Sequence, residues 1–142
     1  MEIVHVPYGK VTSHIKALLP FLEKSEKWSH GRANADDILR LVLTERLHLC
    51  IIKDNDDVLG YFGLEVKQYP QCKMLVIQYC AMETGTLEKV QDDMVRTTEA
   101  IAKQLGCIGI EFIGRPGWRN VVTSNGYILQ DVLYQKMIGE PK

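Results

Sequence analysis

A strand–helix–strand unit between residues 73 and 113 constrains the fold of this chain most. Residues 73–82 read KMLVIQYCAM, a run rich in β-forming residues and apolar on both faces, which is typical of a central strand. An amphipathic pattern over 87–105 predicts a helix ended by Gly106, and residues 107–113 return as a short apolar strand. Strands joined by such a helix lie parallel in one sheet, so the sequence predicts a β-α-β crossover.

The remaining segments are assigned by their apolar spacing and by turn residues. Strands are predicted at 2–6, 47–53, 58–67 and 127–138, and helices at 12–25, after an N-cap at Asn34, and from Pro116 to Gly126. Pro20 falls inside the first helix, which it should kink or divide. The predicted order is therefore β-α-α-β-β-β-α-β-α-β.

Composition excludes several classes of protein. At 142 residues the chain has room for one domain, 46% hydrophobic residues suffice for a core, and a net charge of -1 gives no general attraction to nucleic acid. The four cysteines lie in apolar runs without a C-x-x-C pair, which favours reduced core residues, and the four histidines lack metal-ligand spacing. Without a signal peptide or a membrane span in the sequence, we expect a cytoplasmic protein.

Over nearly its whole length, the predicted order resembles the GNAT acetyltransferase fold. More narrowly, four motifs resemble the GNAT-like proteins encoded by bacteriophages and prophages: QYP at 68–70, LGC at 105–107, GRPGW at 114–118 and NGY at 125–127. The resemblance implies a single three-layer α+β domain spanning residues 1–142. Its mixed, mostly antiparallel sheet would have six to seven strands, a central parallel pair and helices on both faces.

The resemblance also implies acetyl-CoA as the cofactor, held where the two parallel strands splay apart. The residues it places there are Cys80, Ala81, Met82, Thr84, Gly85 and Thr86. Independently of the resemblance, a helix N-terminus presents free N–H groups and a positive dipole end, so an anion there is stabilised by about 0.3–1 kcal/mol. The loop departs from the family pattern Q/R-x-x-G-x-G/A, since only Gly85 is kept and Glu83 and Glu88 add negative charge.

Two carboxylates and one tyrosine are the catalytic candidates. Glu111 or Glu83 would serve as general base for an attacking amine; alternatively, Glu111 is an outward residue bonded to a neighbouring lysine. Many family members have a tyrosine four residues before the glycine of the NGY motif as proton donor, and Val122 occupies that position here. Tyr127 or Tyr134 could reach the cleft from another direction; the alternative is that these tyrosines pack in the core or on the surface.

Two further groups of residues are candidates for binding. Arg115 follows a strand at its carboxyl end, where it would contact a phosphate, or the GRPGW motif is purely a strand end and helix start. Trp28, His30 and Arg32 lie in the connection that borders the acceptor site in GNAT proteins, which makes them candidates for contact with a substrate or partner. The alternative for that connection is a solvated loop with one packed tryptophan.

Two functions follow from these observations. The first is an acyl-CoA N-acetyltransferase that acts on a small-molecule or protein amine without a metal. The second is a catalytically inactive GNAT-like phage protein that serves as a virion component or binds a host or phage protein, in the host cytoplasm or the virion; the altered loop and Val122 favour it. Neither nucleic acid nor membrane is an expected partner, and an exposed edge of the last strand would allow a homodimer.

Overall fold

The structure is a computed structural model that describes residues 1–114 and 118–140. Its elements, in chain order, are β1 (Glu2–His5), the 3-10 helix η1 (Tyr8–His14), α1 (Ile15–Trp28), α2 (Ala35–Leu43), β2 (His48–Asp54), β3 (Asp57–Gln68), β4 (Lys73–Met82), α3 (Thr86–Gln104), β5 (Gly109–Phe112) and α4 (Arg119–Thr123). In this part of the chain, no helix has the length and apolar character needed to cross a membrane.

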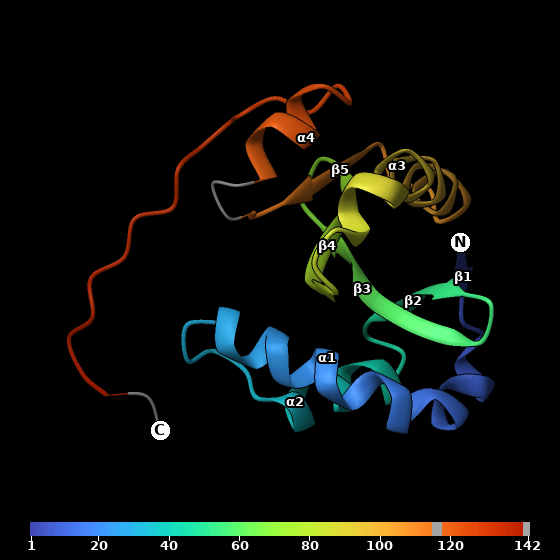
Figure 1. Ribbon diagram of the computed structural model, residues 1–142. Coiled ribbons are helices and arrows are strands. Elements are labelled where there is room, and N and C mark those ends of the chain that lie inside the picture. The colour runs from blue at the N-terminus through green and yellow to red at the C-terminus, as the bar shows by residue number, and fades with distance from the viewer. Residues whose placement is uncertain (115–117, 141–142) are drawn as a thin grey trace.

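The sheet has five strands in the order β1-β2-β3-β4-β5 (Figure 1). All neighbouring pairs are antiparallel except β4 and β5, which run parallel as the crossover predicts. The expected six to seven strands are wrong for the described residues, and the parallel pair lies at one end of the sheet rather than at its centre. The missing strand is 127–138, which has an extended course outside the sheet.

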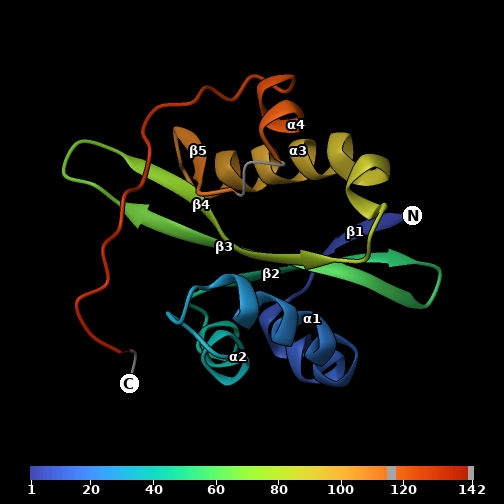
Figure 2. The same cartoon turned by 60° about the vertical axis from the view of Figure 1, so that its left-hand side comes forward.

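Helices cover both faces of the sheet, so the three-layer α+β architecture is confirmed. Figure 2 shows α1 and α2 on one face and α3 and α4 on the other. Two apolar clusters fill the layers between helices and sheet: one contains Leu18, Leu22, Ile38 and Tyr61, and the other contains Phe62, Leu75, Val90 and Ile101. We name the strands β1–β4 with these two clusters the frame.

The early helices differ from the prediction in their bounds. The predicted helix 12–25 begins as the 3-10 turn η1 and continues as α1 to Trp28, and Pro20 lies inside α1 without dividing it. The N-cap at Asn34 is confirmed, because its side chain accepts from the Asp37 backbone N–H at 2.8 Å while the Asp37 carboxylate accepts from the Asn34 N–H. These paired bonds fix where α2 begins.

One glycine permits the close approach of β3 to the end of β4. A Cβ at Gly60 would lie 2.4 Å from the Cβ of Met82 and 2.6 Å from the carbonyl oxygen of Ala81. Because the second of these neighbours is backbone, it cannot move aside as a side chain would. Gly60 thereby holds the carboxyl end of β4, which is where the site lies.

Candidate functional site

The site begins where β4 and β5 stop pairing. Their parallel register runs from Met74–Gly109 to Ile77–Phe112, after which β5 ends and β4 continues to Met82. At the same point β4 carries a bulge: Gly63 of β3 pairs with Tyr79 and Leu64 with Ile77, so that Gln78 is an extra residue. The edge of β4 turned away from β3 therefore has no strand beside it over residues 78–82 in the described structure.

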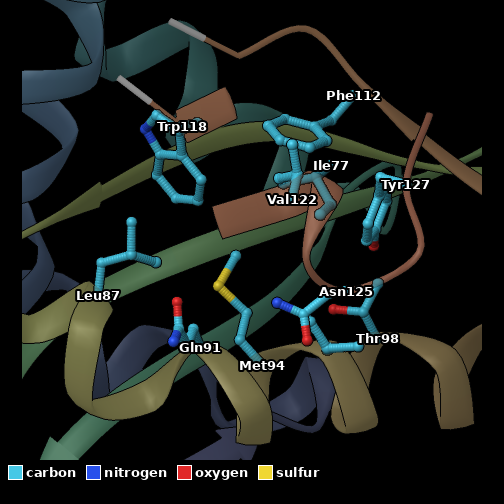
Figure 3. Close-up of a pocket in the computed structure, with 11 residues that line it drawn as sticks. Ile77, Leu87, Gln91, Met94, Thr98, Phe112, Trp118, Val122, Asn125 and Tyr127 are labelled. Carbon is cyan, nitrogen blue, oxygen red and sulfur yellow. The ribbon is translucent and has the colours of Figure 1, made fainter. Parts of the chain in front are cut away.

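A pocket opens beside this point, between α3 and α4 (Figure 3). It contains about 350 Å³ of space that no atom fills, part of it open to solvent. Its lining is Ile77, Leu87, Gln91, Met94, Val95, Thr98, Phe112, Trp118, Val122, Asn125 and Tyr127. Ile77 and Phe112 are the last paired residues of β4 and β5, so the pocket and the end of pairing form one site.

One buried hydroxyl in the pocket has no partner. Thr98 is fully buried, and its Oγ1 has no hydrogen-bond partner among the described residues. Figure 3 shows Thr98, Asn125 and Tyr127 grouped at one end of the pocket and Leu87 at the other. Most of the lining is apolar, and the Gln91 amide lies beside Leu87 at the end opposite to Thr98, Asn125 and Tyr127.

The loop from β4 to α3 presents a helix N-terminus to solvent. Gly85 is the N-cap residue in a left-handed conformation, with φ of 84°, and a Cβ there would meet no atom within 4 Å. Thr84 and Gly85 are exposed and Thr86 is buried. The Thr86 N–H donates to the Glu83 carbonyl at 3.1 Å, and the positive end of the α3 dipole favours an anion at this exposed turn.

A lysine from another element lies at the same end of β4. The Lys24 ammonium, on α1, donates a hydrogen bond of 3.2 Å to the carbonyl oxygen of Met82. Sequence reasoning missed this residue, since the only signal was one lysine in an amphipathic helix. Lys24 supplies positive charge near Glu83, whose exposed carboxylate opposes an anion in the loop.

The three predicted residues that end β4 lie on different faces. Cys80 and Met82 pack on the side of α3, and Ala81 is buried on the side of α1. No disulfide joins the described cysteines; Cys50 and Cys107 are buried, and Cys72 and Cys80 are half-buried. Burial raises the pKa of the Cys50 thiol to about 12, so that residue stays protonated.

Glu111 bonds a tyrosine and not the lysine of the alternative prediction. The Tyr69 hydroxyl donates a 2.6 Å hydrogen bond to Glu111 Oε1, and the Lys67 ammonium lies 5.0 Å from the centre of the Tyr69 ring. The bond to Glu111 raises the pKa of Tyr69. Glu111 is half-buried and pairs with Val76, one residue before pairing ends. Its carboxylate is thus held beside the opening, whereas Glu83 is exposed at the far end of β4.

Tyr127 lines the pocket and Val122 lines it too. The Tyr127 ring meets Phe112 edge to face at 5.9 Å between centroids, and its backbone N–H donates to the Val122 carbonyl at 3.1 Å. Burial, and to a lesser degree the charge of Glu99, raise the pKa of Tyr127. Tyr127 is therefore protonated at neutral pH and is the tyrosine that reaches this pocket.

The predicted binding residues of the α1–α2 connection, Trp28, His30 and Arg32, do not line the pocket. Trp28 is 47% exposed at the end of α1, and His30 follows with a φ of 55°. Arg32 donates a 2.6 Å hydrogen bond to Gln135 Oε1 of the C-terminal segment. Arg115 lies outside the described residues, as does the predicted helix start at Pro116.

Solved acetyltransferase structures share this architecture. A probable acetyltransferase aligns over 99% of this chain and 99% of its own with a TM-score of 0.77 at 13% identity. Glucosamine-6-phosphate N-acetyltransferase from Arabidopsis thaliana covers 97% and 98% (TM-score 0.67, 11% identity). An aminoglycoside acetyltransferase from an uncultured soil metagenomic sample, solved with sisomicin, covers 97% and 96% (TM-score 0.68, 10% identity). The chain has the GNAT-like fold of these proteins.

The likeness is one of structure alone. No protein-family model matches the sequence, and no curated protein matches it. At 10–14% identity, fold is retained while side chains at a site are free to differ. The function must therefore be argued from this chain's own residues.

Proposed function

We propose that this chain is a GNAT-type N-acetyltransferase that binds acetyl-CoA at the divergence of β4 and β5. The observation that carries the proposal is the end of pairing at Ile77–Phe112, with the Gln78 bulge, while β4 continues for five more residues. This arrangement leaves backbone groups of β4 free to bond the amides of an extended ligand. It also directs β4 to the N-terminus of α3, where a phosphate would be received.

The described residues fit this cofactor. Gly85 leaves open space at the first turn of α3, Lys24 adds a cation at Met82, and the neighbouring pocket is mostly apolar. When bound, acetyl-CoA supplies an acetyl group activated as a thioester. The N–H groups near the Gln78 bulge would polarise its carbonyl, as donors fixed in place do in other acyl transfers.

Glu111 is the better of the two candidate bases. It stands across from Val76, two residues before the bulge, whereas Glu83 follows the bulge by five residues, about 16 Å along an extended strand. The Tyr69 hydroxyl donates a hydrogen bond to the Glu111 carboxylate, which fixes the position of that group beside the opening. Tyr127 is our proposed proton donor to the departing thiolate, in place of the tyrosine that Val122 replaces.

Thermal unfolding with acetyl-CoA tests binding. A ligand at about 100 times its dissociation constant adds roughly 2.7 kcal/mol to the free energy of unfolding. Gly85→Asp should weaken binding at least tenfold relative to Gly85→Asn, because both side chains accept a left-handed backbone and only aspartate places a charge against the phosphate. Absence of stabilisation at millimolar acetyl-CoA, or equal affinity of the two variants, contradicts the proposal.

Turnover with a panel of amines tests catalysis separately. Release of free CoA thiol should be detectable with at least one amine, and Glu111→Gln should lower kcat about 10²–10⁴-fold. Tyr127→Phe is the parallel test of the proton donor. Stabilisation by acetyl-CoA without turnover on any amine would instead favour a non-catalytic binding protein.

That second function has one specific observation in its favour. Val122 lines the pocket at the position where the resemblance expects a proton-donating tyrosine. A chain that kept the fold but lost the chemistry would bind a protein partner instead. A phage or host partner stays a prediction, since neither the fold nor the matched structures bear on it.

A further inference from the structure

The pocket between α3 and α4 continues past the bulge at Gln78. Its lining on α3 runs from Leu87 to Thr98, which is about 16 Å of helix. The edge of β4 without a neighbour runs from Met82 back to Gln78, which is about 13 Å of strand. In a β-α-β crossover the helix runs antiparallel to the strand before it, so both lengths start at the β4–α3 loop and run in the same direction. The pocket is therefore longer than the open edge by about 3 Å.

The middle of the pocket has more apolar surface than an acetyl group can cover. It lies between Met94 of α3, Phe112 of β5 and Val122 of α4 (Figure 3). The methyl group of an acetyl ester is about the size of one water molecule, which occupies about 30 Å³. The pocket contains about 350 Å³ that no atom fills, part of it open to solvent. Each further methylene group buried there should tighten binding about fourfold.

Thr98 places a hydroxyl without a partner at the end of the pocket away from the β4–α3 loop. The residue is fully buried, and its Oγ1 has no hydrogen-bond partner among the described residues. Figure 3 shows the side chain beside Asn125 and Tyr127 at this end. An oxygen atom of a ligand would supply the missing hydrogen bond, which is worth most where water is excluded. The 3 Å between the level of Gln78 and that of Thr98 is about two carbon–carbon bonds of roughly 1.5 Å each.

The charges around this end favour a neutral oxygen over a carboxylate. None of the described residues that line the pocket carries a charged side chain. Burial, and then the charge of Glu99, raise the pKa of Tyr127, so the nearest carboxylate makes this end of the pocket unfavourable for an anion. A carboxylate on the ligand would be buried here without a cation, which is costly. A hydroxyl or keto oxygen meets neither penalty.

We infer that this chain prefers, over acetyl-CoA, a CoA thioester of a short acyl group with a neutral oxygen at carbon 3, for which 3-hydroxybutyryl-CoA is the probe. The inference rests on the proposed function, in which the thioester carbonyl, carbon 1, lies at Gln78. Carbon 3 is then two bonds further, at the level of Thr98, whose hydroxyl binds the oxygen. Met94, Phe112 and Val122 contact the carbon chain. Acetyl-CoA occupies the same site and leaves the Thr98 hydroxyl without a partner.

Calorimetric titration with four CoA esters tests this preference. Butyryl-CoA should bind about tenfold more tightly than acetyl-CoA, because it buries two further methylene groups. The better-bound enantiomer of 3-hydroxybutyryl-CoA should bind about fivefold more tightly again, because its hydroxyl bonds that of Thr98. Succinyl-CoA has the same four carbons and ends in a carboxylate, so it should bind no more tightly than acetyl-CoA. Tighter binding of succinyl-CoA than of 3-hydroxybutyryl-CoA overturns the inference.

A matched pair of threonine variants assigns the preference to one hydroxyl. Thr98→Val keeps the branched shape of the side chain, so it should abolish the advantage of 3-hydroxybutyryl-CoA over butyryl-CoA while the affinity for butyryl-CoA stays the same. Thr97→Val makes the same change at a half-buried neighbour that does not line the pocket, and should keep the advantage. An advantage that survives in Thr98→Val overturns the inference.

The same titrations separate this inference from the proposed function. Binding of acetyl-CoA with no tighter binding of butyryl-CoA or 3-hydroxybutyryl-CoA overturns the inference alone and leaves the proposed function intact. Failure of all four esters to bind at millimolar concentration contradicts both. Matching far-UV circular dichroism of wild type, Thr97→Val and Thr98→Val shows that a change in affinity does not come from unfolding.

Discussion

The frame and the part of the chain after α3 differ in how completely their residues are paired and shielded from water. β3 has twelve residues and is paired on both sides, and Tyr61, Phe62 and Leu64 within it are fully buried. β5 has four half-buried residues, and the C-terminal segment is exposed. The candidate site lies at the junction between them, because β4 belongs to the frame and extends beyond its partner β5. A rigid frame thus holds one wall of the site, and a sparsely packed region provides the other.

Core truncation should give the largest effect. Phe62→Ala should lower the free energy of unfolding by about 3–5 kcal/mol, because the ring is fully buried between β3 and α3. Tyr134→Ala, at a residue 88% exposed, should change it by less than about 0.5 kcal/mol. Chemical denaturation of both variants measures the contrast, and comparable losses would mean that the two regions do not differ.

The frame was predictable from the sequence because its signals are local. The hairpin around Asp54–Asp57, the cap at Asn34 and the amphipathic pattern of α3 each depend on residues close together in the chain. The parallel pair followed from the crossover, and the acetyltransferase-like architecture followed from the order of elements. Residues 127–138 were predicted as a strand because they are rich in apolar residues. Apolar residues are neighbours in this segment, however, whereas an ordinary edge strand alternates apolar and polar residues.

The site was predictable only in part. The helix N-terminus at Gly85 and the carboxylate at Glu111 are visible in the sequence, because a glycine before an amphipathic run and a charge in an apolar strand are local irregularities. Lys24 and Tyr69 reach the site across 58 and 42 residues of sequence. Such contacts depend on how layers pack, and no single-residue signal marks them.

A buried hydrogen bond tests how firmly α1 is joined to the frame. The Ser25 and Tyr61 hydroxyls are bonded at 2.5 Å, and both residues are buried. Tyr61→Phe should lower the free energy of unfolding by about 1–3 kcal/mol, because it leaves the Ser25 hydroxyl without this partner. Adding Ser25→Ala to Tyr61→Phe should recover part of the loss. A double variant that is less stable than Tyr61→Phe would show that this bond is not the cause.

Thr98, in α3, tests the packing around the pocket, and its replacement should raise the free energy of unfolding rather than lower it. Its hydroxyl is buried without a partner among the described residues, so Thr98→Val should raise the free energy of unfolding by about 1 kcal/mol. Thr97→Val is the matched control, since it makes the same change at a half-buried neighbour in α3. Destabilisation by Thr98→Val alone would mean that the hydroxyl has a partner, such as a bound water.

The smallest effect is expected at the outer edge of the frame, where the rings of His5 on β1 and His48 on β2 lie with centroids 5.6 Å apart. Partial burial of the ring, and then the charge of His48, lower the pKa of His5 below 6.5. Near pH 6 the unfolded chain therefore binds more protons than the folded chain, and the stability that neutral His5 provides is lost as pH falls through 6.5.

His5→Gln should therefore flatten the decrease in the free energy of unfolding between pH 7.5 and 5.5, measured as the shift of the urea midpoint. Glu45 lines the same hollow and stays unchanged in this variant, so its contribution is common to both proteins. A pH dependence as steep in His5→Gln as in wild type would assign the acid sensitivity elsewhere. Because β1 is the frame's outer strand and His5 is exposed, water screens the electrostatic interaction between His5 and His48. The extent to which a group is shielded from water therefore sets how much it contributes to the free energy of unfolding.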